Sequence, residues 1–447
     1  APWAVVPALL LALVPALTAA VDLTNWAFAR VLPPRALPKV DHSEGIPADF
    51  RTLVVVPGLA SGPADIDALL TNVRAHYLRN PDPALAFAVL SDFPDADGPD
   101  RPEDAAVLDH AAAALAELNA ATPGAPFLLL HRRRLQNAAE GTWMGWERKR
   151  GKLHELNRLL RGATDTSFVL VAGDHARLAG VRFVITLDAD TILPPDAAAR
   201  LVGTLAHPLN RAEFDDRTRV TAGYTVLQPR AETDPASAGR SAFTRAMAGD
   251  STVDLYNMAV SNVYQDLLGE GIYMGKGIYD VDAFERSLAG RVPENSMLSH
   301  DMFEGIQGRA GLVSDIIVYE DYPPNYLVAA LRHHRWIRGD WQLLRWLSPR
   351  VPSEHGPARN DIALIDRWKL TDNLRRSLVP IAAAALLAAA WLLLPGSPLV
   401  WMVLALLSPL SGLIAGVLRT LAGMAAAALG RDRTRSWLAG IVPLRRQ

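Results

Sequence analysis

The chain has 447 residues and no cysteine, with 21% charged residues and a formal net charge of -2. These values exclude a disulfide-stapled scaffold and a basic nucleic-acid-binding protein, so we expect no nucleic-acid partner. Half of the residues are hydrophobic, and the longest apolar runs lie near the two ends. This distribution predicts a membrane protein with a water-soluble middle.

The first apolar run covers residues 1–21 and contains no charge before Asp22. About twenty apolar residues suffice to cross the hydrocarbon core of a bilayer, so this run predicts a transmembrane helix. A signal peptide is the alternative, but the run has neither an initiator Met nor a basic segment in front of it. We therefore expect a piece of a longer protein that starts at or inside a membrane helix.

A soluble domain over residues 45–370 follows, in which short apolar runs alternate with helical patterns. The predicted strands are residues 52–56, 85–90, 127–130, 168–171 and 181–187, and the helical patterns lie at 65–78 and 104–119. Such alternation predicts an α/β fold with a mostly parallel sheet.

Acidic residues follow two of the predicted strands. Asp92 comes after the second, and Asp188 and Asp190 come after the fifth. Ligands of open α/β sheets bind beyond the carboxyl ends of the strands. Two carboxylates one residue apart at that edge can share a Mg²⁺ or Mn²⁺ ion whose other ligands are substrate phosphates. An acidic pair in a loop is commonly only solvated, but its position directly after an apolar strand favours a metal site.

The glycine-rich segment GEGIYMGKG, residues 269–277, resembles a phosphate-binding loop. The P-loop spacing requires Gly where Glu270 stands and Ser or Thr where Gly277 stands, and both are missing. We therefore predict a glycine-rich turn with a close backbone approach rather than a nucleoside triphosphatase.

Two more apolar runs, residues 377–394 and 399–418, are separated by the turn sequence PGSP. They predict a transmembrane helical hairpin over residues 377–418, followed by a basic cytoplasmic tail over 419–447. The basic residues that flank the predicted spans are Arg30, Arg35, Lys39, Arg375, Arg376, Arg419, Arg431, Arg433 and Arg435. By the positive-inside rule they place the soluble domain in the cytosol. This predicts a multi-pass protein of a bacterial-type inner (cytoplasmic) membrane, with membrane lipid as a partner.

The motifs Asp92, Asp188-Ala189-Asp190, His300-Asp301 and Arg335-Trp336 occur in the order found in processive family-2-type glycosyltransferases of the GT-A (Rossmann-like) fold. Longer strings narrow the resemblance: GTWMGWERKRGKLHELNRLLRG, FVITLDADTILPPDAAARLVGTLAHPLNR, VYQDLLGEGIYMGKGIYDVDAFE, LSHDMFEG and HHRWIRGDWQLLRWL. Together they resemble the glycosyltransferase region of cyclic β-1,2-glucan synthases over about residues 50–380. The resemblance implies a GT-A domain flanked by transmembrane α-helices.

It also implies UDP-glucose as the donor, Mg²⁺ or Mn²⁺ as the cofactor, and transfer with inversion to a growing β-1,2-glucan that is attached to the protein itself. Two departures limit it. Arg332 stands where the Gln of the family's Q-x-x-R-W element would be, so that Gln's acceptor contact is not transferred. Full-length synthases also carry further helices and large carbohydrate-active domains downstream. We expect this chain to start or extend a linear glucan without closing the ring.

Within this resemblance, Asp301 is expected to be the base that takes the proton of the acceptor hydroxyl. Its alternative role is the N-cap of the helix that begins at MFEGI. Asp190 is expected to bind the metal that bridges the diphosphate, and Asp188 to contact the ribose or assist the metal.

Asp92 is expected to accept from the uracil N–H, with a turn residue as its alternative role. Lys152 is expected to neutralise donor phosphate, although the nearby Lys149 and Arg150 are equally basic. Arg335 is expected to bind the diphosphate, and Trp336 to stack on an acceptor sugar.

Three other tryptophans, Trp341, Trp346 and Trp368, are candidates to line a glucan path or to sit at the membrane interface. The adjacent His333 and His334 project in different directions on a regular element, which disfavours a zinc site.

Two alternatives to a β-1,2-glucan synthase stay open at this point. One is another membrane polysaccharide synthase of the cellulose or hyaluronan kind, which differs in the linkage of its product. The other is a catalytically inactive membrane scaffold, which predicts no metal-dependent binding of a UDP-sugar.

Overall fold

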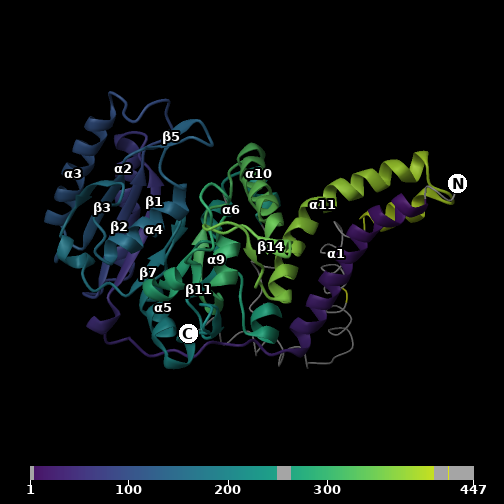
Figure 1. Ribbon diagram of the computed structural model, residues 1–447, viewed down its shortest axis with the longest axis horizontal. Helices are drawn as coiled ribbons and strands as arrows, with labels where there is room; N and C mark the ends of the chain where they lie inside the picture. Colours follow the sequence, from purple (N-terminus) through teal and green to yellow (C-terminus); the bar gives the residue numbers. More distant parts are fainter. Residues whose placement is uncertain (1–4, 249–262, 298, 407–420, 422–447) are drawn as a thin grey trace. The chain divides into compact units, whose positions relative to one another are not determined.

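The computed structural model describes residues 5–248, 263–297, 299–406 and 421 (Figure 1). The chain divides into two compact units. Unit 1 comprises Ala1–Arg30, Met247–Met258 and Arg375–Gln447, and unit 2 comprises Val31–Ala246 and Ala259–Leu374.

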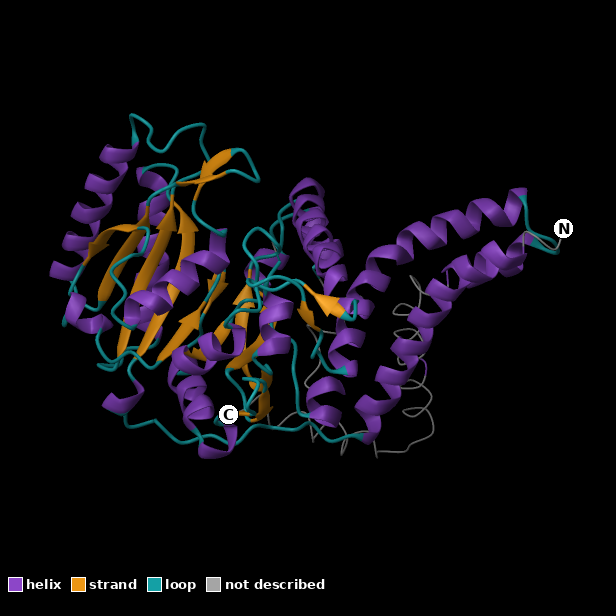
Figure 2. Ribbon diagram, in the orientation of Figure 1, coloured by secondary structure: helices purple, strands orange, loops and turns teal. Residues whose placement is uncertain are grey.

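Unit 2 is built around a nine-stranded sheet (Figure 2). In spatial order its strands are β6 (Phe168–Ala172), β3 (Phe127–Arg132), β2 (Leu85–Asp92), β1 (Thr52–Leu59), β7 (Phe183–Thr186), β12 (Gly277–Asp280), β11 (Val226–Thr233), β13 (Gly311–Glu320) and β8 (Thr191–Ile192).

Six of these nine strands point in one direction. The strands β3, β2, β1 and β7 pair in parallel. The antiparallel β12 lies between β7 and β11, so that β11 and its parallel neighbour β13 regain the direction of β7. Only β6, β12 and β8 run the opposite way. The predicted α/β class with a mostly parallel sheet is therefore confirmed.

Helices pack on both faces of this sheet. One face is covered by α2 (Pro63–Arg79), α3 (Asp104–Ala120) and α5 (Ala197–Ala206), and the other by α4 (Arg148–Leu160) and α8 (Val281–Leu288). Unit 2 also contains α6 (Pro235–Ala238), α7 (Ala242–Met247), α9 (Asp301–Gln307), α10 (Tyr326–Gln342) and the first residues of α11 (Leu364–Leu392). Three two-stranded ribbons complete it: β4 (Leu135–Asn137) with β5 (Thr142–Met144), β9 (Glu213–Phe214) with β10 (Val220–Ala222), and β14 (Arg350–Val351) with β15 (Ala358–Arg359).

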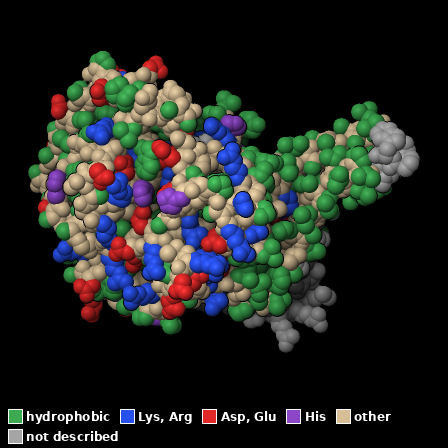
Figure 3. All heavy atoms as spheres, in the orientation of Figure 1, with side chains coloured by type: hydrophobic (Ala, Val, Ile, Leu, Met, Phe, Trp, Pro, Cys, Tyr) green, Lys and Arg blue, Asp and Glu red, His purple; other side chains and the backbone are tan. Residues whose placement is uncertain are grey.

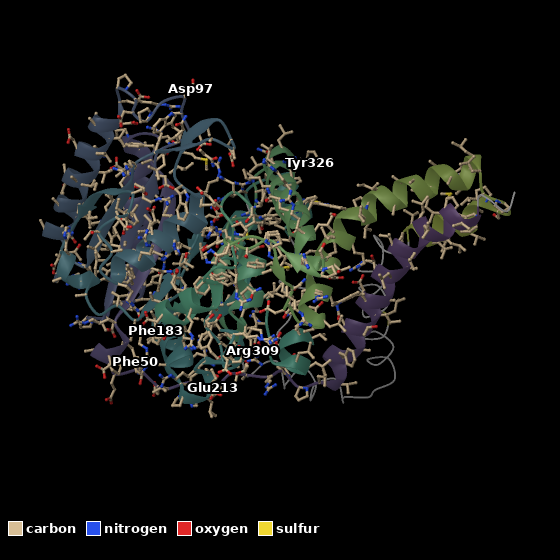
Figure 4. All side chains as sticks on the ribbon, viewed as in Figure 1. Phe50, Asp97, Phe183, Glu213, Arg309 and Tyr326 are labelled. Carbon is tan, nitrogen blue, oxygen red and sulfur yellow. The ribbon has the colours of Figure 1, made fainter. Side chains whose placement is uncertain are left out.

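Burial on both faces explains why the strands read as continuous apolar runs. Val54 and Val56 of β1 contribute to the cluster under α2, α3 and α5, whereas Leu53 and Val55 contribute to the cluster under α4 and α8. Successive side chains of a strand point to opposite faces, so a strand covered on both sides needs apolar residues at every position. Near the amino end of β7, Phe183 stacks on Phe50 at a ring-centroid distance of 5.8 Å (Figure 4).

All five predicted strands and both predicted helices are present. β1 and β2 run two or three residues beyond their predicted ends, and β7 is shorter than its apolar run. The insertion of β12 between β7 and β11 was not predicted.

Unit 1 contains α1 (Val5–Val31), most of α11 (Leu364–Leu392) and a helical stretch at 398–406. Two helices of the described part are long and apolar enough to cross a membrane, Val6–Asn25 and Leu364–Leu392, judged by length and composition. In Figure 3 hydrophobic side chains cover most of α1 and the carboxyl half of α11, whereas charges of both signs are spread over unit 2. The domain limits 1–21, 45–370 and 377–418 stay predictions. Residues 1–4 of the first predicted span, 407–418 of the hairpin, and 419–420 and 422–447 of the tail lie outside the described residues.

Candidate active site

The carboxyl edge of the sheet carries a cluster of alternating charges centred on Asp188. This residue follows β7, and its two carboxylate oxygens lie 2.5 Å from Nζ of Lys149 and 3.2 Å from Nζ of Lys276. Burial would raise the pKa of Asp188, but the two ammonium groups outweigh it and lower the pKa to about 2. Asp188 is therefore a carboxylate held between two lysines.

Lys276 reaches this edge because of the direction of β12. That strand is antiparallel to β7 and begins at Gly277, which pairs with Thr186 at the end of β7. The residue before β12 therefore lies beside the residues that follow β7. Nζ of Lys276 also lies 2.5 Å from Oε1 of Glu320, the last residue of β13. Only the insertion of β12 into the sheet brings Lys276 and Asp188 together.

Lys149 is in the first turn of α4, and it links Asp188 to the glycine-rich turn. Its Nζ donates to the carbonyl oxygen of Gly275 at 2.9 Å as well as to Asp188. Burial alone would lower the pKa of Lys149, but the carboxylates of Asp188 and Asp301 outweigh it and raise that pKa. Lys149 is thus a permanent cation between two carboxylates.

Asp301 lies against the same turn. It is the first residue of α9, whose N-cap is His300, so the alternative role of Asp301 as the N-cap is wrong. Its Oδ1 atom is buried and accepts no hydrogen bond from the residues that the structure describes. A Cβ atom added at Gly275 would lie 2.5 Å from Oδ1 of Asp301, and the φ of Gly275 is +77°. The predicted close backbone approach of the glycine-rich segment is therefore confirmed.

His300 and Glu304 stand behind Asp301. Nδ1 of His300 lies 2.8 Å from Oε2 of Glu304 and 3.5 Å from Oδ1 of Asp301. Burial would lower the pKa of His300, but Glu304 and Asp301 outweigh it and raise that pKa. Ligand atoms of the three residues lie within 4.8 Å of one another, close enough to hold a metal ion. An imidazolium between two carboxylates satisfies the same geometry by ion pairing alone.

Asp190 projects from the loop after β7 with its side chain 39% exposed. Its Oδ2 lies 3.3 Å from Nη2 of Arg332, which belongs to α10. Arg332 is the residue that replaces the Gln of the Q-x-x-R-W element, and its guanidinium lies 5.4 Å from the ring centroid of Trp336. The substitution therefore brings a cation to the second carboxylate of the D-x-D pair.

Asp92, at the end of β2, lies in a separate buried ion cluster. Arg132 donates to both of its oxygens, Nε to Oδ1 at 2.7 Å and Nη2 to Oδ2 at 2.9 Å, and Nζ of Lys152 lies 3.0 Å from Oδ2. Lys152 also donates to the carbonyl oxygens of Gly58 and Leu90. The side chains of Asp92 and Lys152 are 5% and 4% exposed. The donor-binding roles of these two residues stay predictions, while their contacts hold β1, β2 and α4 together.

The predicted Arg335 and Trp336 are exposed residues of α10, and Trp336 is 49% exposed. Trp346 is different: it is 1% exposed and packs on Phe303 of α9 at a centroid distance of 5.2 Å. The prediction that Trp346 lines a glucan path or a membrane interface is wrong, because its ring is part of the core beside α9.

Reasoning from the sequence missed Lys276 and Glu320 of the Asp188 cluster, and it named Lys149 only as a basic alternative to Lys152. The D-x-D pair and the glycine-rich segment were both noticed, but nothing in the sequence pairs them. Together the groups form an edge where lysines can bind an anion, Asp190 can meet a cation, and the carboxylate of Asp301 can accept a proton.

Fold and site thus define an α/β protein whose polar cluster lies beyond the carboxyl ends of its central strands. Sequence comparison finds a relative that is a much longer protein. Over 421 residues, 92% of this chain, the sequence is 45% identical to cyclic beta-(1,2)-glucan synthase NdvB of Rhizobium meliloti (strain 1021). The chain spans 14% of the length of that relative. The resemblance to cyclic β-1,2-glucan synthases that the motifs predicted is confirmed by this identity.

Two other comparisons say less about the identity of the chain. No protein-family model matches the chain. Among solved structures, mannosyl-3-phosphoglycerate synthase from Rubrobacter xylanophilus aligns with 70% of this chain and 88% of its own, at 14% identity and a TM-score of 0.29. A TM-score of 0.29 is too low for this similarity to define the fold.

Proposed function

We propose that this chain is the glycosyltransferase part of a membrane β-glucan synthase, which transfers glucose from UDP-glucose with inversion to a growing β-1,2-glucan. The observation that carries the proposal is the meeting of the D-x-D pair, the glycine-rich turn and Asp301 at one sheet edge, in a chain 45% identical to a segment of a glucan synthase. Residues 45–370 form the catalytic domain in this proposal, on the cytosolic side of an inner membrane, and 1–21 and 377–418 contain the spans.

The donor diphosphate is proposed to bind at the two lysines of the Asp188 cluster. Lys149 and Lys276 are both charged, and both lie at the edge where ligands of such sheets bind. A diphosphate would share these cations with Asp188, and Arg335 of α10 would add a fork of donors. The predicted Asp92 and Lys152 then act from the end of β2, which is separated from β7 by β1, at the uridine and the phosphate.

A divalent ion fits one of the two D-x-D carboxylates better than the other. Asp190 is partly exposed and its Oδ2 meets a single guanidinium at 3.3 Å, which an entering cation could displace. Asp188 already has an ammonium group on each oxygen. We propose that Asp190 would hold Mg²⁺ or Mn²⁺, with Asp188 assisting. When bound, such an ion neutralises charge on the leaving diphosphate.

Asp301 is proposed to take the proton of the acceptor hydroxyl as that oxygen bonds to the anomeric carbon. The bond between this carbon and the diphosphate oxygen breaks in the same displacement, so UDP leaves with the electron pair and the configuration inverts. The buried Oδ1 of Asp301 lacks a hydrogen-bond donor among the described residues, which leaves it able to accept this proton. Trp336 is proposed to stack on the acceptor sugar.

The test is transfer of radiolabelled glucose from UDP-glucose into glucan by membranes that contain the chain, with Mg²⁺ or Mn²⁺ and with a chelator. We expect transfer by the wild type with metal, a loss of about 100-fold or more in Asp301→Asn and in Asp190→Ala, and wild-type transfer in Asp282→Asn. Asp282 of α8 is the matched control because it is an exposed carboxylate that pairs with Arg161 at the end of α4.

Transfer that survives in Asp301→Asn would contradict the assignment of the base. Metal-dependent transfer that yields another linkage would point to a synthase of the cellulose or hyaluronan kind. A wild-type chain that fails to bind UDP-glucose with metal would refute the proposal in favour of an inactive scaffold.

A further inference from the structure

Unit 2 contains a half-open pocket of about 450 Å³ that the proposed transfer does not use. Its walls come from Trp146, from α4 and α8, from Ala289 and the segment 292–294, and from single residues of α9 and the β14–β15 ribbon. A volume of this size lies within the usual range for small-molecule sites. The side chains that matter for its chemistry are Trp146, Arg150 and His154 together with four glutamates, Glu285, Glu294, Glu304 and Glu354.

These side chains are oriented by contacts with one another. Oε2 of Glu285 lies 2.9 Å from Nδ1 of His154, and Oε1 of the same carboxylate accepts from Nδ2 of Asn157 at 2.6 Å. Nε1 of Trp146 donates to Oε1 of Glu294 at 2.7 Å. Acceptors and an indole ring are therefore held in place before a ligand arrives, which reduces the entropy lost on binding.

The composition of the wall suits a neutral ligand with many hydroxyl groups. Carboxylates only accept hydrogen bonds, so the glutamates match hydroxyl donors, and Arg150 supplies donors for hydroxyl or ring oxygens. Trp146 and Phe284 offer apolar surface to the C–H face of a sugar ring. The glutamates disfavour an anion, and Arg150, whose guanidinium lies 5.7 Å from the ring centroid of Trp146, offsets part of their negative charge.

The pocket is connected to Asp301 through α9. Glu304 lines the pocket, and its Oε2 is the atom that lies 2.8 Å from Nδ1 of His300. His300 in turn lies 3.5 Å from Asp301. A ligand that bonds to Glu304 therefore touches the carboxylate that holds His300 beside the proposed base.

We infer that this pocket is a glucan-binding subsite, which holds glucose units of the growing chain next to α9 through Trp146, Glu285 and Glu304. The inference rests on the proposed function for the identity of the sugar. The subsite is separate from the donor site at Asp188 and Asp190. Its role is to retain the polymer between successive transfers.

The test is isothermal titration of the full chain in detergent with sophorose, the β-1,2-linked disaccharide of glucose, and with a longer linear β-1,2-glucan. Glu285→Gln and Glu354→Gln change two residues of the wall, and the second lies in an exposed loop where a folding defect is not expected. Glu117→Gln on the exposed surface of α3 is the matched control. We expect sugar binding to weaken about tenfold or more in both pocket variants and to keep its wild-type strength in the control.

Sugar binding of wild-type strength in both pocket variants would overturn the subsite. Displacement of the sugar by spermidine in the wild type would also overturn it, because the pocket would then be a cation site. UDP-glucose titrated on the same samples separates the two proposals. A wild type that binds sophorose in a Glu285-dependent way but not UDP-glucose supports the subsite and contradicts the proposed transfer.

Discussion

The buried ion cluster at the end of β2 allows a prediction that separates stability from donor binding. Asp92→Asn removes the charge of a side chain that is 5% exposed and that contacts Arg132 at 2.7 and 2.9 Å and Lys152 at 3.0 Å. Two buried cations would then face Glu155 alone, whose Oε2 lies 2.8 Å from Nη1 of Arg132.

Removing one partner of a buried ion pair costs about 3–5 kcal/mol. Asparagine keeps one carbonyl acceptor for Arg132, so we expect a loss at the lower end, about 3 kcal/mol in the free energy of unfolding. At about 2–4 °C for each kcal/mol, the melting temperature should fall by about 6–12 °C. Thermal unfolding of the full chain in detergent measures this shift.

The matched control is Asp104→Asn, which disrupts a second buried arginine–carboxylate pair, between Arg134 and the first residue of α3. Nη1 of Arg134 lies 2.5 Å from Oδ2 of Asp104, whose side chain is 11% exposed at the start of α3. We expect a somewhat smaller loss of stability, and no change in UDP-glucose affinity measured below both transitions. If Asp92 also contacts the uridine, Asp92→Asn alone lowers that affinity.

An unchanged melting temperature in Asp92→Asn would refute the energetic reasoning about the cluster. Equal donor affinities in the two variants would leave its stabilising role intact and contradict its predicted role at the uridine.

Two further predictions concern the surroundings of Asp301. Gly275→Ala and Gly290→Ala impose similar backbone strain, because the φ angles of these glycines are +77° and +73°. The new Cβ atom of Gly275→Ala would lie 2.5 Å from Oδ1 of Asp301, whereas that of Gly290→Ala would lie no nearer than 3.9 Å to its surroundings. We expect both variants to lose about 1 kcal/mol in the free energy of unfolding. Only Gly275→Ala should lower the rate of glucose transfer, by about tenfold or more, and equal transfer rates in the two variants would contradict the close approach. Folding raises the pKa of His300, so protonation of this histidine stabilises the folded state. This contribution is complete below the unfolded pKa of about 6.5 and is lost as the pH rises through the folded pKa. The free energy of unfolding should therefore fall above about pH 6.5 in the wild type and less steeply in His300→Gln, and parallel urea-unfolding profiles from pH 6 to 9 would refute this.

The sequence by itself determined the class of the fold and the edge of the site. A sheet covered on both faces requires uninterrupted apolar strands, and this local signal located β1, β2, β3, β6 and β7 together with α2 and α3. Because each acidic motif directly follows such a strand, Asp92, Asp188 and Asp190 could be assigned to the carboxyl edge before any contact was known.

Only the tertiary structure decided which charges meet at that edge. Lys149 and Lys152 lie in the same turn of α4 and are equally basic, yet one binds Asp188 and the other is buried against Asp92. Lys276 joins Asp188 because β12 enters the sheet antiparallel to β7. Local sequence patterns report burial and periodicity, whereas these pairings depend on strand order and helix orientation, which only the packing of distant segments determines.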